Sequence, residues 1–193
     1  VVRGVVVEEA TDVDLHWSRD EDDDFKLNFE LRDPTRDGPF GLLYKAQIEM
    51  TSTVKAPTKF PGSNGLSAAR YPYDVDEAYA QFLFHGPAFR GITNVVGLSD
   101  HGIVANIQTS TPSTLGQEGN YWVTDPVTLD SVLQLMVLWV RETRGISALP
   151  SHIGEYKQYA PIRGIVSCHM RFEPTSSAQG RFRATIVDAE DRV

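Results

Sequence analysis

The sequence predicts an α+β fold in which an antiparallel sheet surrounds one long buried helix. Within the 193 residues, short segments rich in β-branched and aromatic side chains alternate with polar turns, a pattern typical of strands. One segment, 125–143, is instead apolar around nearly its whole helical circumference, which is typical of a helix buried on all sides. Because strand-like segments come both before and after this helix, the sheet has to close around it.

The expected strands fall into two groups. They lie at 5–7, 13–17, 25–31 and 42–50, and then at 92–98, 103–108, 153–159, 165–172 and 181–187. A short helix is expected at 74–82, ahead of the second group. Residues 56–70, in a stretch rich in Ser, Thr, Pro and Gly, are expected to link a β unit at 1–55 to a larger unit at 71–193. From this pattern we expect the larger unit, one buried helix inside a sheet, to be a hot-dog fold.

The long helix has recognisable ends. Asp125 is a good N-cap, Pro126 suits the first helical position, and Gly145 stands just past the last turn. We place Asp130 in the first turn and Gln134 four residues later, on the same face.

The composition is acidic and otherwise ordinary. Lys and Arg total 18, Asp and Glu total 26, and the formal net charge is −8. This argues against nucleic acid and anionic membrane as partners, because both require a basic surface. No segment is long and apolar enough to span a bilayer, and a single cysteine excludes an intrachain disulfide. We therefore expect a cytoplasmic protein. Because the chain starts at Val1 and stops at Val193 within a strand-and-turn pattern, we also expect a piece of a longer polypeptide.

Asp130 and Gln134 are the first candidates for chemistry. The helix dipole favours a carboxylate near a helix start, and a carboxyl group that loses solvent among apolar neighbours is suited to donating a proton. Gln134 would hydrogen-bond this group and fix its orientation. From spacing alone, a purely capping role for Asp130 is slightly favoured over the catalytic one.

The loop 84–89 is a second candidate. Gly86 and Pro87 force a tight turn, which would place the polar side chain of His85 beside a substrate channel. The alternative is a structural turn in which His85 bonds to the backbone, and the residues alone favour this alternative.

Other residues carry less weight. Cys168 and His169 are neighbours on a strand and point to opposite faces, so they cannot form a catalytic dyad. The acidic run 20–24 lacks the spaced ligands and the glycine of a calcium loop, so we interpret it as a solvated hairpin turn. Paired cysteines, histidines at ligand spacing and a glycine-rich phosphate loop are all missing from the sequence, and we expect neither metal nor cofactor.

Two segments also carry the motifs of a family. Residues 79–92 contain Phe-His-Gly-Pro-Ala-Phe, and residues 125–134 contain an Asp-x-x-x-Gln motif made by Asp130 and Gln134. Together they resemble the second half of the dehydratase domains of type I polyketide synthases, closest to the variant in polyunsaturated-fatty-acid and enediyne-type synthases. Residues 149–156 resemble the strand that follows, and residues 2–51 resemble the last strands of the first half.

The resemblance implies a double hot dog, with 71–193 as the second half and 1–55 as the truncated end of the first. It implies removal of water from a β-hydroxyacyl thioester on an acyl carrier protein, giving the α,β-enoyl thioester. A His of the first half would take the α-proton, Asp130 would protonate the departing hydroxyl, and Gln134 would orient Asp130. The residues implied to bind substrate are His85, Gly86, Pro87 and Phe89. The implied partners are the acyl carrier protein, the missing first half and other synthase domains, and a homodimer is left open.

The chain departs from the family pattern in two respects. The family's catalytic His stands in His-x-x-x-Gly-x-x-x-x-Pro, whereas the fourth residues after the five histidines are Asp20, Phe89, Ala105, Tyr156 and Glu173. His85 stands where many relatives have Tyr. We therefore expect the chain alone to be inactive. The alternatives are a non-catalytic hot-dog scaffold and a product-template-like domain, which guides cyclisation in the same fold.

Overall fold

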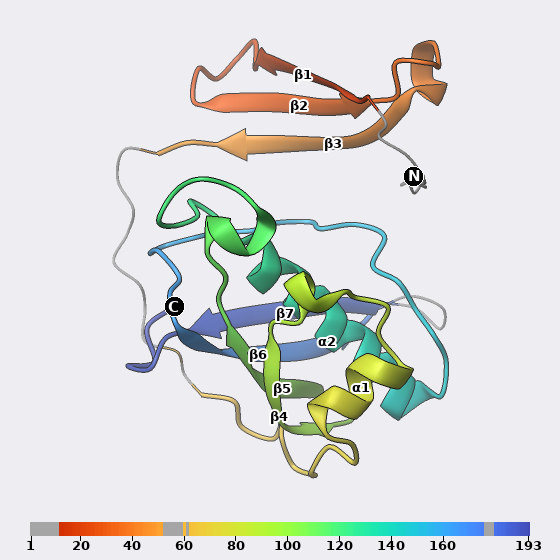
Figure 1. The fold of residues 1–193 in the computed structure, drawn as a ribbon, viewed down its shortest axis with the longest axis vertical. Helices are drawn as coiled ribbons and strands as arrows, with labels where there is room; N and C mark the ends of the chain where they lie inside the picture. The colour runs from red at the N-terminus through yellow and green to blue at the C-terminus, as the bar shows by residue number, and fades with distance from the viewer. Residues whose placement is uncertain (1–11, 52–59, 61, 176–179) are drawn as a thin grey trace. The chain divides into compact units, whose positions relative to one another are not determined.

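The computed structural model describes residues 12–51, 60, 62–175 and 180–193. Contacts divide the chain into two compact units, Val1–Lys55 with Ser151–Gly154, and Ala56–Pro150 with Glu155–Val193. Each unit has its own antiparallel sheet (Figure 1). The strand expected at 5–7 lies outside the described residues.

The first unit is a three-stranded sheet in the order β1-β2-β3. Its strands are β1 (Asp14–Arg19), β2 (Lys26–Arg32) and β3 (Leu42–Glu49), with a 3-10 turn at Gly38–Phe40 before β3. The strands predicted at 13–17, 25–31 and 42–50 are thus confirmed. Side chains that alternate in character along a segment suit the pleated surface of a strand.

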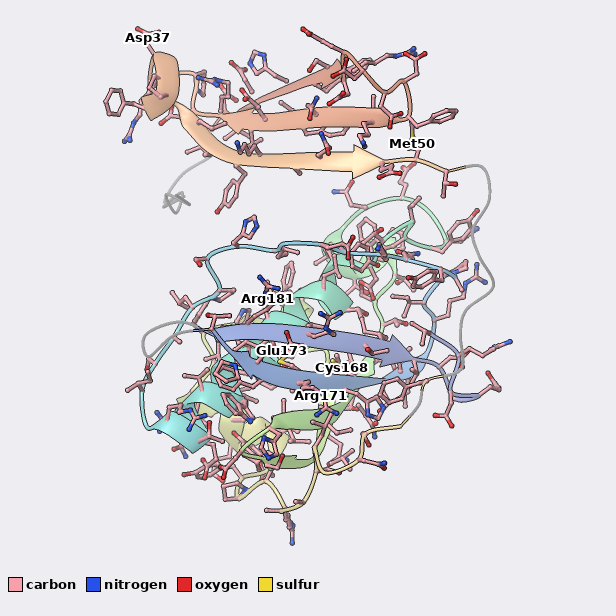
Figure 2. The ribbon with its side chains drawn as sticks, turned by 180° about the vertical axis from the view of Figure 1, so that it is seen from behind. Asp37, Met50, Cys168, Arg171, Glu173 and Arg181 are labelled. Carbon is pink, nitrogen blue, oxygen red and sulfur yellow. The ribbon has the colours of Figure 1, made fainter. Side chains whose placement is uncertain are left out.

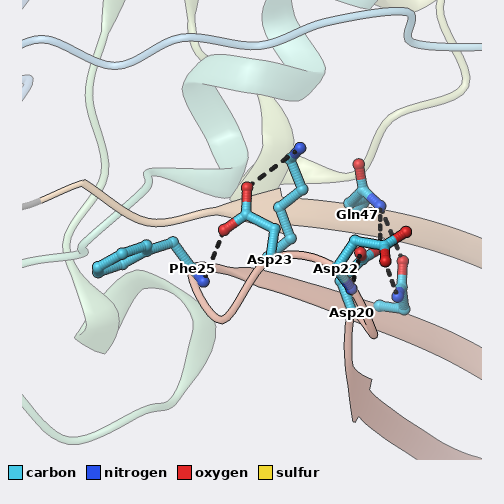
Figure 3. Close-up of polar contacts among 7 residues, drawn as sticks. Asp20, Asp22, Asp23, Phe25 and Gln47 are labelled. Carbon is cyan, nitrogen blue, oxygen red and sulfur yellow. Dashed lines mark hydrogen bonds and ion pairs between the residues drawn. The ribbon is translucent and has the colours of Figure 1, made fainter.

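The acidic run forms the turn between β1 and β2, as predicted (Figure 3). Asp23 accepts a hydrogen bond of 3.0 Å from the Phe25 backbone N–H and lies 3.3 Å from the Lys26 ammonium. The backbone hydrogen bond, and then the Lys26 contact, lower the pKa of Asp23. The contacts of Asp23 are therefore those of a hairpin turn.

The second unit holds a four-stranded antiparallel sheet in the order β4-β5-β6-β7. Its strands are β4 (Ile92–Ser99), β5 (Gly102–Gln108), β6 (Ile165–Pro174) and β7 (Gly180–Val187). The helices are α1 (Val75–Gln81) and α2 (Pro126–Arg144), with 3-10 turns η2 (Pro87–Phe89) and η3 (Pro112–Leu115). Helix α2 packs against β4, β5 and β6 (Figure 1). Neither helix of the described residues is long and apolar enough to cross a membrane.

The core lies between the sheet and α2. On β6 the side chains of Val166, Cys168 and Met170 are buried while Arg171 is exposed, as the two-residue period of a strand requires (Figure 2). The fully buried residues of α2 include Leu135, Leu138 and Trp139. The Trp139 indole donates a 2.8 Å hydrogen bond to the Ser99 carbonyl, so its one polar atom is satisfied inside the core.

Helix α2 is not buried on all sides, contrary to the prediction. The side chains left half-buried are Leu129, Val132, Leu133, Met136 and Val137. Helix α2 contacts the sheet through β4, β5 and β6, and three of these five side chains, Val132, Met136 and Val137, pack against the core while remaining partly exposed. Apolar composition around a helix therefore overstated how much of it this unit covers.

The strand predicted at 153–159 is wrong, because this segment joins neither sheet. Ile153 is 58% exposed, and Gly154 lowers the propensity for a strand. Gln158 bonds instead to the Thr124 hydroxyl at 3.0 Å and to the Val123 carbonyl at 2.7 Å. The segment is thus held by side-chain hydrogen bonds to the loop before α2.

Part of the range expected to be a linker belongs to the second unit. Leu66 is 2% exposed, and Ala69 pairs with Leu98 of β4 through two backbone hydrogen bonds of 2.9 Å. These contacts extend the second unit towards the chain's N-terminus, ahead of residue 71.

Candidate active site

The start of α2 sets the position of the acid. Asp125 is the N-cap and its carboxylate accepts a 3.0 Å hydrogen bond from the Val127 N–H, while Pro126 occupies the first helical position. Both features are confirmed. Counting from them, Asp130 is the fifth helical residue and lies in the second turn, so its predicted place in the first turn and its capping role are wrong. The cap is already supplied by Asp125.

Asp130 and Gln134 make the contact that their spacing predicts. The Gln134 side-chain amide donates a 2.7 Å hydrogen bond to Oδ2 of Asp130 and a 2.8 Å hydrogen bond to the Phe89 carbonyl. Gln134 is 1% exposed, whereas the Asp130 side chain is 29% exposed. A buried amide therefore holds a carboxyl group that solvent still reaches.

Tyr79 of α1 fixes the other end of that amide. Its hydroxyl donates a 2.8 Å hydrogen bond to Oε1 of Gln134 and accepts one of 3.1 Å from the Ile92 N–H. Burial raises the pKa of Tyr79, so the phenol stays protonated and able to donate. Sequence reasoning missed Tyr79 because its partner is 55 residues away, and a tyrosine on an amphipathic helix gives no sign of such a contact.

His85 lies against the acid. Its Nε2 is 3.2 Å from Oδ2 of Asp130, its side chain is 13% exposed, and its ring stacks on Phe84 with centroids 4.3 Å apart. The favoured interpretation, a ring bonded to the backbone, is wrong among the described residues, because no hydrogen bond reaches its Nδ1. The contact joins a loop to a helix 45 residues later, which spacing could not reveal.

The remaining residues of the loop contribute backbone. Gly86 precedes η2 and Pro87 begins it, and both are exposed, while Phe89 supplies the carbonyl that Gln134 binds. The Arg90 guanidinium donates a 3.3 Å hydrogen bond to the His85 carbonyl and lies 5.3 Å from the centre of the Tyr79 ring. A cation therefore stands beside the loop that carries His85.

Gly91 allows the chain to pass close to α2. A Cβ at this position would lie 2.3 Å from Oγ of Ser131 and 3.0 Å from Val127. Any larger residue would push the segment 89–92 away from the helix. The close approach is what brings the Phe89 carbonyl within reach of Gln134.

Cys168 and His169 lie apart from this site. Cys168 is fully buried in the core, and burial raises the pKa of its thiol to about 12, which leaves it protonated and unreactive at neutral pH. His169 points to the other face of β6, where its ring lies 4.5 Å from that of Phe60. Among the residues that the structure describes, no group of three or more His, Cys, Asp or Glu side chains could hold a metal ion.

Comparisons with known proteins agree with these motifs. A family model described as the polyketide synthase dehydratase N-terminal domain matches residues 58–193. One large chain of the polyunsaturated fatty acid synthase of Thraustochytrium sp. is 33% identical over 125 residues, which are 62% of this chain and 4% of that protein. The chain thus spans a small part of this relative's length. Because the matching family model is that of an N-terminal domain, the assignment of 71–193 to the second half stays a prediction.

Solved dehydratases share the fold. The dehydratase domain of a mycocerosic acid synthase-like polyketide synthase superimposes with a TM-score of 0.58 at 18% identity, covering 89% of this chain and 60% of that one. A variant of the GphF dehydratase gives 0.50 at 13% identity, covering 88% and 61%. The predicted α+β hot-dog fold is confirmed. With a family model that spans well over half of its residues, the protein belongs to the polyketide synthase dehydratase family.

Proposed function

We propose that this chain supplies the acid of a site that removes water from a β-hydroxyacyl thioester held on an acyl carrier protein. The observation that carries the proposal is Asp130, a partly exposed carboxyl group held on α2 by the buried amide of Gln134. Membership of the dehydratase family supports it, and favours it over a non-catalytic scaffold and over a product-template-like domain.

The elimination needs one base and one acid. The base removes the proton from Cα, which the thioester carbonyl acidifies, and the electron pair forms the Cα–Cβ double bond as the Cβ–O bond breaks. Hydroxide is a poor leaving group, so the oxygen must receive a proton as it departs. Asp130 gives that proton, the products are water and the enoyl thioester, and Gln134 keeps the acid aimed.

In this proposal the base comes from the first hot-dog half. None of the five histidines stands in the family's catalytic His motif, and His85 contacts the acid. In this proposal 71–193 is the second half of a double hot dog, 1–55 is the end of the first, and the chain alone is inactive. Turnover by the 193-residue chain itself would contradict this assignment.

The loop 85–89 lines the substrate path. His85 contacts Asp130 and the Phe89 carbonyl bonds Gln134, and Gly86 and Pro87 lie between them in the same loop, so an acyl chain that reaches Asp130 passes this loop. The partners are a carrier protein with a phosphopantetheine-linked substrate and the other synthase domains, in the cytoplasm.

The test uses the longer polypeptide that holds this chain together with its first hot-dog half. Carrier protein loaded with a β-hydroxybutyryl group is the substrate, and mass spectrometry follows the loss of water. Asp130→Asn should lower the rate at least about 100-fold, which is the usual contribution of a general acid. Asp100→Asn, the same change in the exposed turn between β4 and β5, is the matched control. An unchanged rate in Asp130→Asn would overturn the acid assignment.

A further inference from the structure

The two oxygens of Asp130 are in different surroundings. Oδ2 receives the Gln134 amide at 2.7 Å and faces Nε2 of His85 at 3.2 Å. Among the described residues, no hydrogen bond reaches Oδ1, although the side chain is 29% exposed. One oxygen is therefore committed to the protein and the other is open to a substrate.

The amide cannot reverse its direction. Both N–H bonds of the Gln134 amide are in use, one to Asp130 and one to the Phe89 carbonyl, and its oxygen accepts from Tyr79. A flipped amide would set its oxygen against the Phe89 carbonyl and the carboxylate, which are both acceptors. Gln134 therefore acts as a donor towards Oδ2 whether or not Asp130 carries a proton.

The histidine is held in one orientation as well. Its ring lies against Phe84, and Arg90 bonds its backbone carbonyl. Nδ1 is buried and has no hydrogen-bond partner, so a proton there would be an unsatisfied buried donor. A neutral ring with its hydrogen on Nε2 leaves only a lone pair at the buried Nδ1 and directs its hydrogen at Oδ2 of Asp130, which would otherwise face the lone pair of Nε2.

We propose that Oδ1 of Asp130 is the oxygen that holds and delivers the proton, and that His85 is a positioning residue that keeps Oδ2 an acceptor. The proposal rests on the proposed function and adds which atom acts and what selects it. As the Cβ–O bond breaks, the proton passes from Oδ1 to the departing oxygen. The carboxylate left behind is stabilised by the two N–H groups already aimed at Oδ2.

Two charged groups contact His85. Asp130 on α2 faces its ring, and Arg90 after η2 bonds its backbone carbonyl, while the Arg90 guanidinium also lies 5.3 Å from the centre of the Tyr79 ring. Only Asp130 reaches the ring nitrogens within hydrogen-bond distance among the described residues, so the tautomer of His85 reports on this one contact.

A spectroscopic test needs no turnover. Nitrogen-15 NMR of the 193-residue chain distinguishes a protonated from an unprotonated ring nitrogen at His85. We expect hydrogen on Nε2 and a bare Nδ1, and a shift of the Nε2 resonance in Asp130→Ala because the 3.2 Å contact is lost, with Asp100→Ala as the control. Hydrogen on Nδ1 in the unmodified chain, or an unchanged spectrum in Asp130→Ala, would overturn the proposal.

A kinetic test separates positioning from packing. In the longer polypeptide, His85→Phe keeps a flat ring but has no donor, whereas His85→Gln keeps an N–H near the position of Nε2. Loss of a hydrogen bond to a charged group predicts a kcat lower by about tenfold or more in His85→Phe, with a smaller change in KM. In His85→Gln we expect a kcat within about threefold of the wild type. A ring that only fills space would give the opposite order and would refute the role.

The outcomes also distinguish this proposal from the proposed function. If the unmodified polypeptide removes no water, the dehydration is refuted while the NMR result still decides the His85–Asp130 contact. If dehydration depends on Asp130 but His85→Phe equals the wild type, only the positioning role fails.

Discussion

Two aspartates five residues apart at the start of α2 have opposite surroundings. The Asp125 carboxylate is 4% exposed and accepts four hydrogen bonds of 2.6 to 3.0 Å, from the hydroxyl and the backbone of Ser110, the Val127 N–H and the Thr128 hydroxyl. Asp130 is partly exposed and uses only one of its oxygens. A carboxylate with all its acceptor sites occupied stabilises the fold, whereas one with a free oxygen in reach of solvent can exchange a proton with a substrate.

Removal of the first acid should give the largest loss of stability. Asp125→Ala deletes four hydrogen bonds and leaves the buried donors of Val127 and Thr128 and the half-buried donors of Ser110 without their acceptor, so we expect the free energy of unfolding to fall by about 3 to 5 kcal/mol. Urea denaturation of the 193-residue chain measures it. Asp74→Ala, which removes the exposed cap of α1, is the control and should cost about 1 kcal/mol. Equal costs for the two would erase the distinction drawn for Asp125.

Crowding the approach to α2 should come next. Gly91→Ala places a Cβ against Ser131, and overpacking of this kind lowers the free energy of unfolding by about 2 kcal/mol. Gly154→Ala is the matched change, because a Cβ there meets nothing within 4 Å. If Gly91→Ala is as stable as Gly154→Ala in the same urea titration, the close packing of residue 91 against Ser131 of α2 does not contribute to stability.

Loss of the Tyr79 hydroxyl should have a smaller effect. Tyr79→Phe leaves Oε1 of Gln134 and the Ile92 N–H without partners, which lowers the free energy of unfolding by about 1 to 2 kcal/mol. Thermal unfolding compares it with the exposed Tyr159→Phe, which should be neutral. A neutral Tyr79→Phe would mean that the amide of Gln134 is held without it.

The second acid should matter least for folding. Asp130→Ala removes the acceptor of one Gln134 N–H, but the position is 29% exposed and water can take its place, so we expect a change within about 1 kcal/mol in urea denaturation. If Asp130→Ala lowered the free energy of unfolding as much as Asp125→Ala, both aspartates would be structural residues and the contrast between them would be wrong.

The fold was predictable where local signals agree. Asp125, Pro126 and Gly145 marked the ends of α2 within a residue, because caps act on their own neighbours. The hairpin turn at 20–24 is local in the same way. The error at 153–159 arose because its apolar side chains resemble a strand, while strand formation depends on a neighbour that is distant in the chain.

The site was predictable only in part. The contact of Asp130 with Gln134 follows from the helical repeat, so four-residue spacing was enough. The contacts of His85 with Asp130 and of Tyr79 with Gln134 are tertiary, and helix period and strand alternation carry no information about them. The family motif drew attention to the loop of His85 but left its partner open.

The hydrogen bonds of Asp125 also affect how much the loop before α2 can vary in length. Ser110 opens this loop and Asp125 closes it, and their two mutual hydrogen bonds join its ends into a ring, with the Trp122 indole donating to the Ser110 hydroxyl at 2.9 Å. Once the ends of a loop are fixed, the entropic cost of lengthening it grows only with the logarithm of its length. Residues 112–121 can therefore gain or lose segments between relatives while α2, and with it the acid, keeps its place.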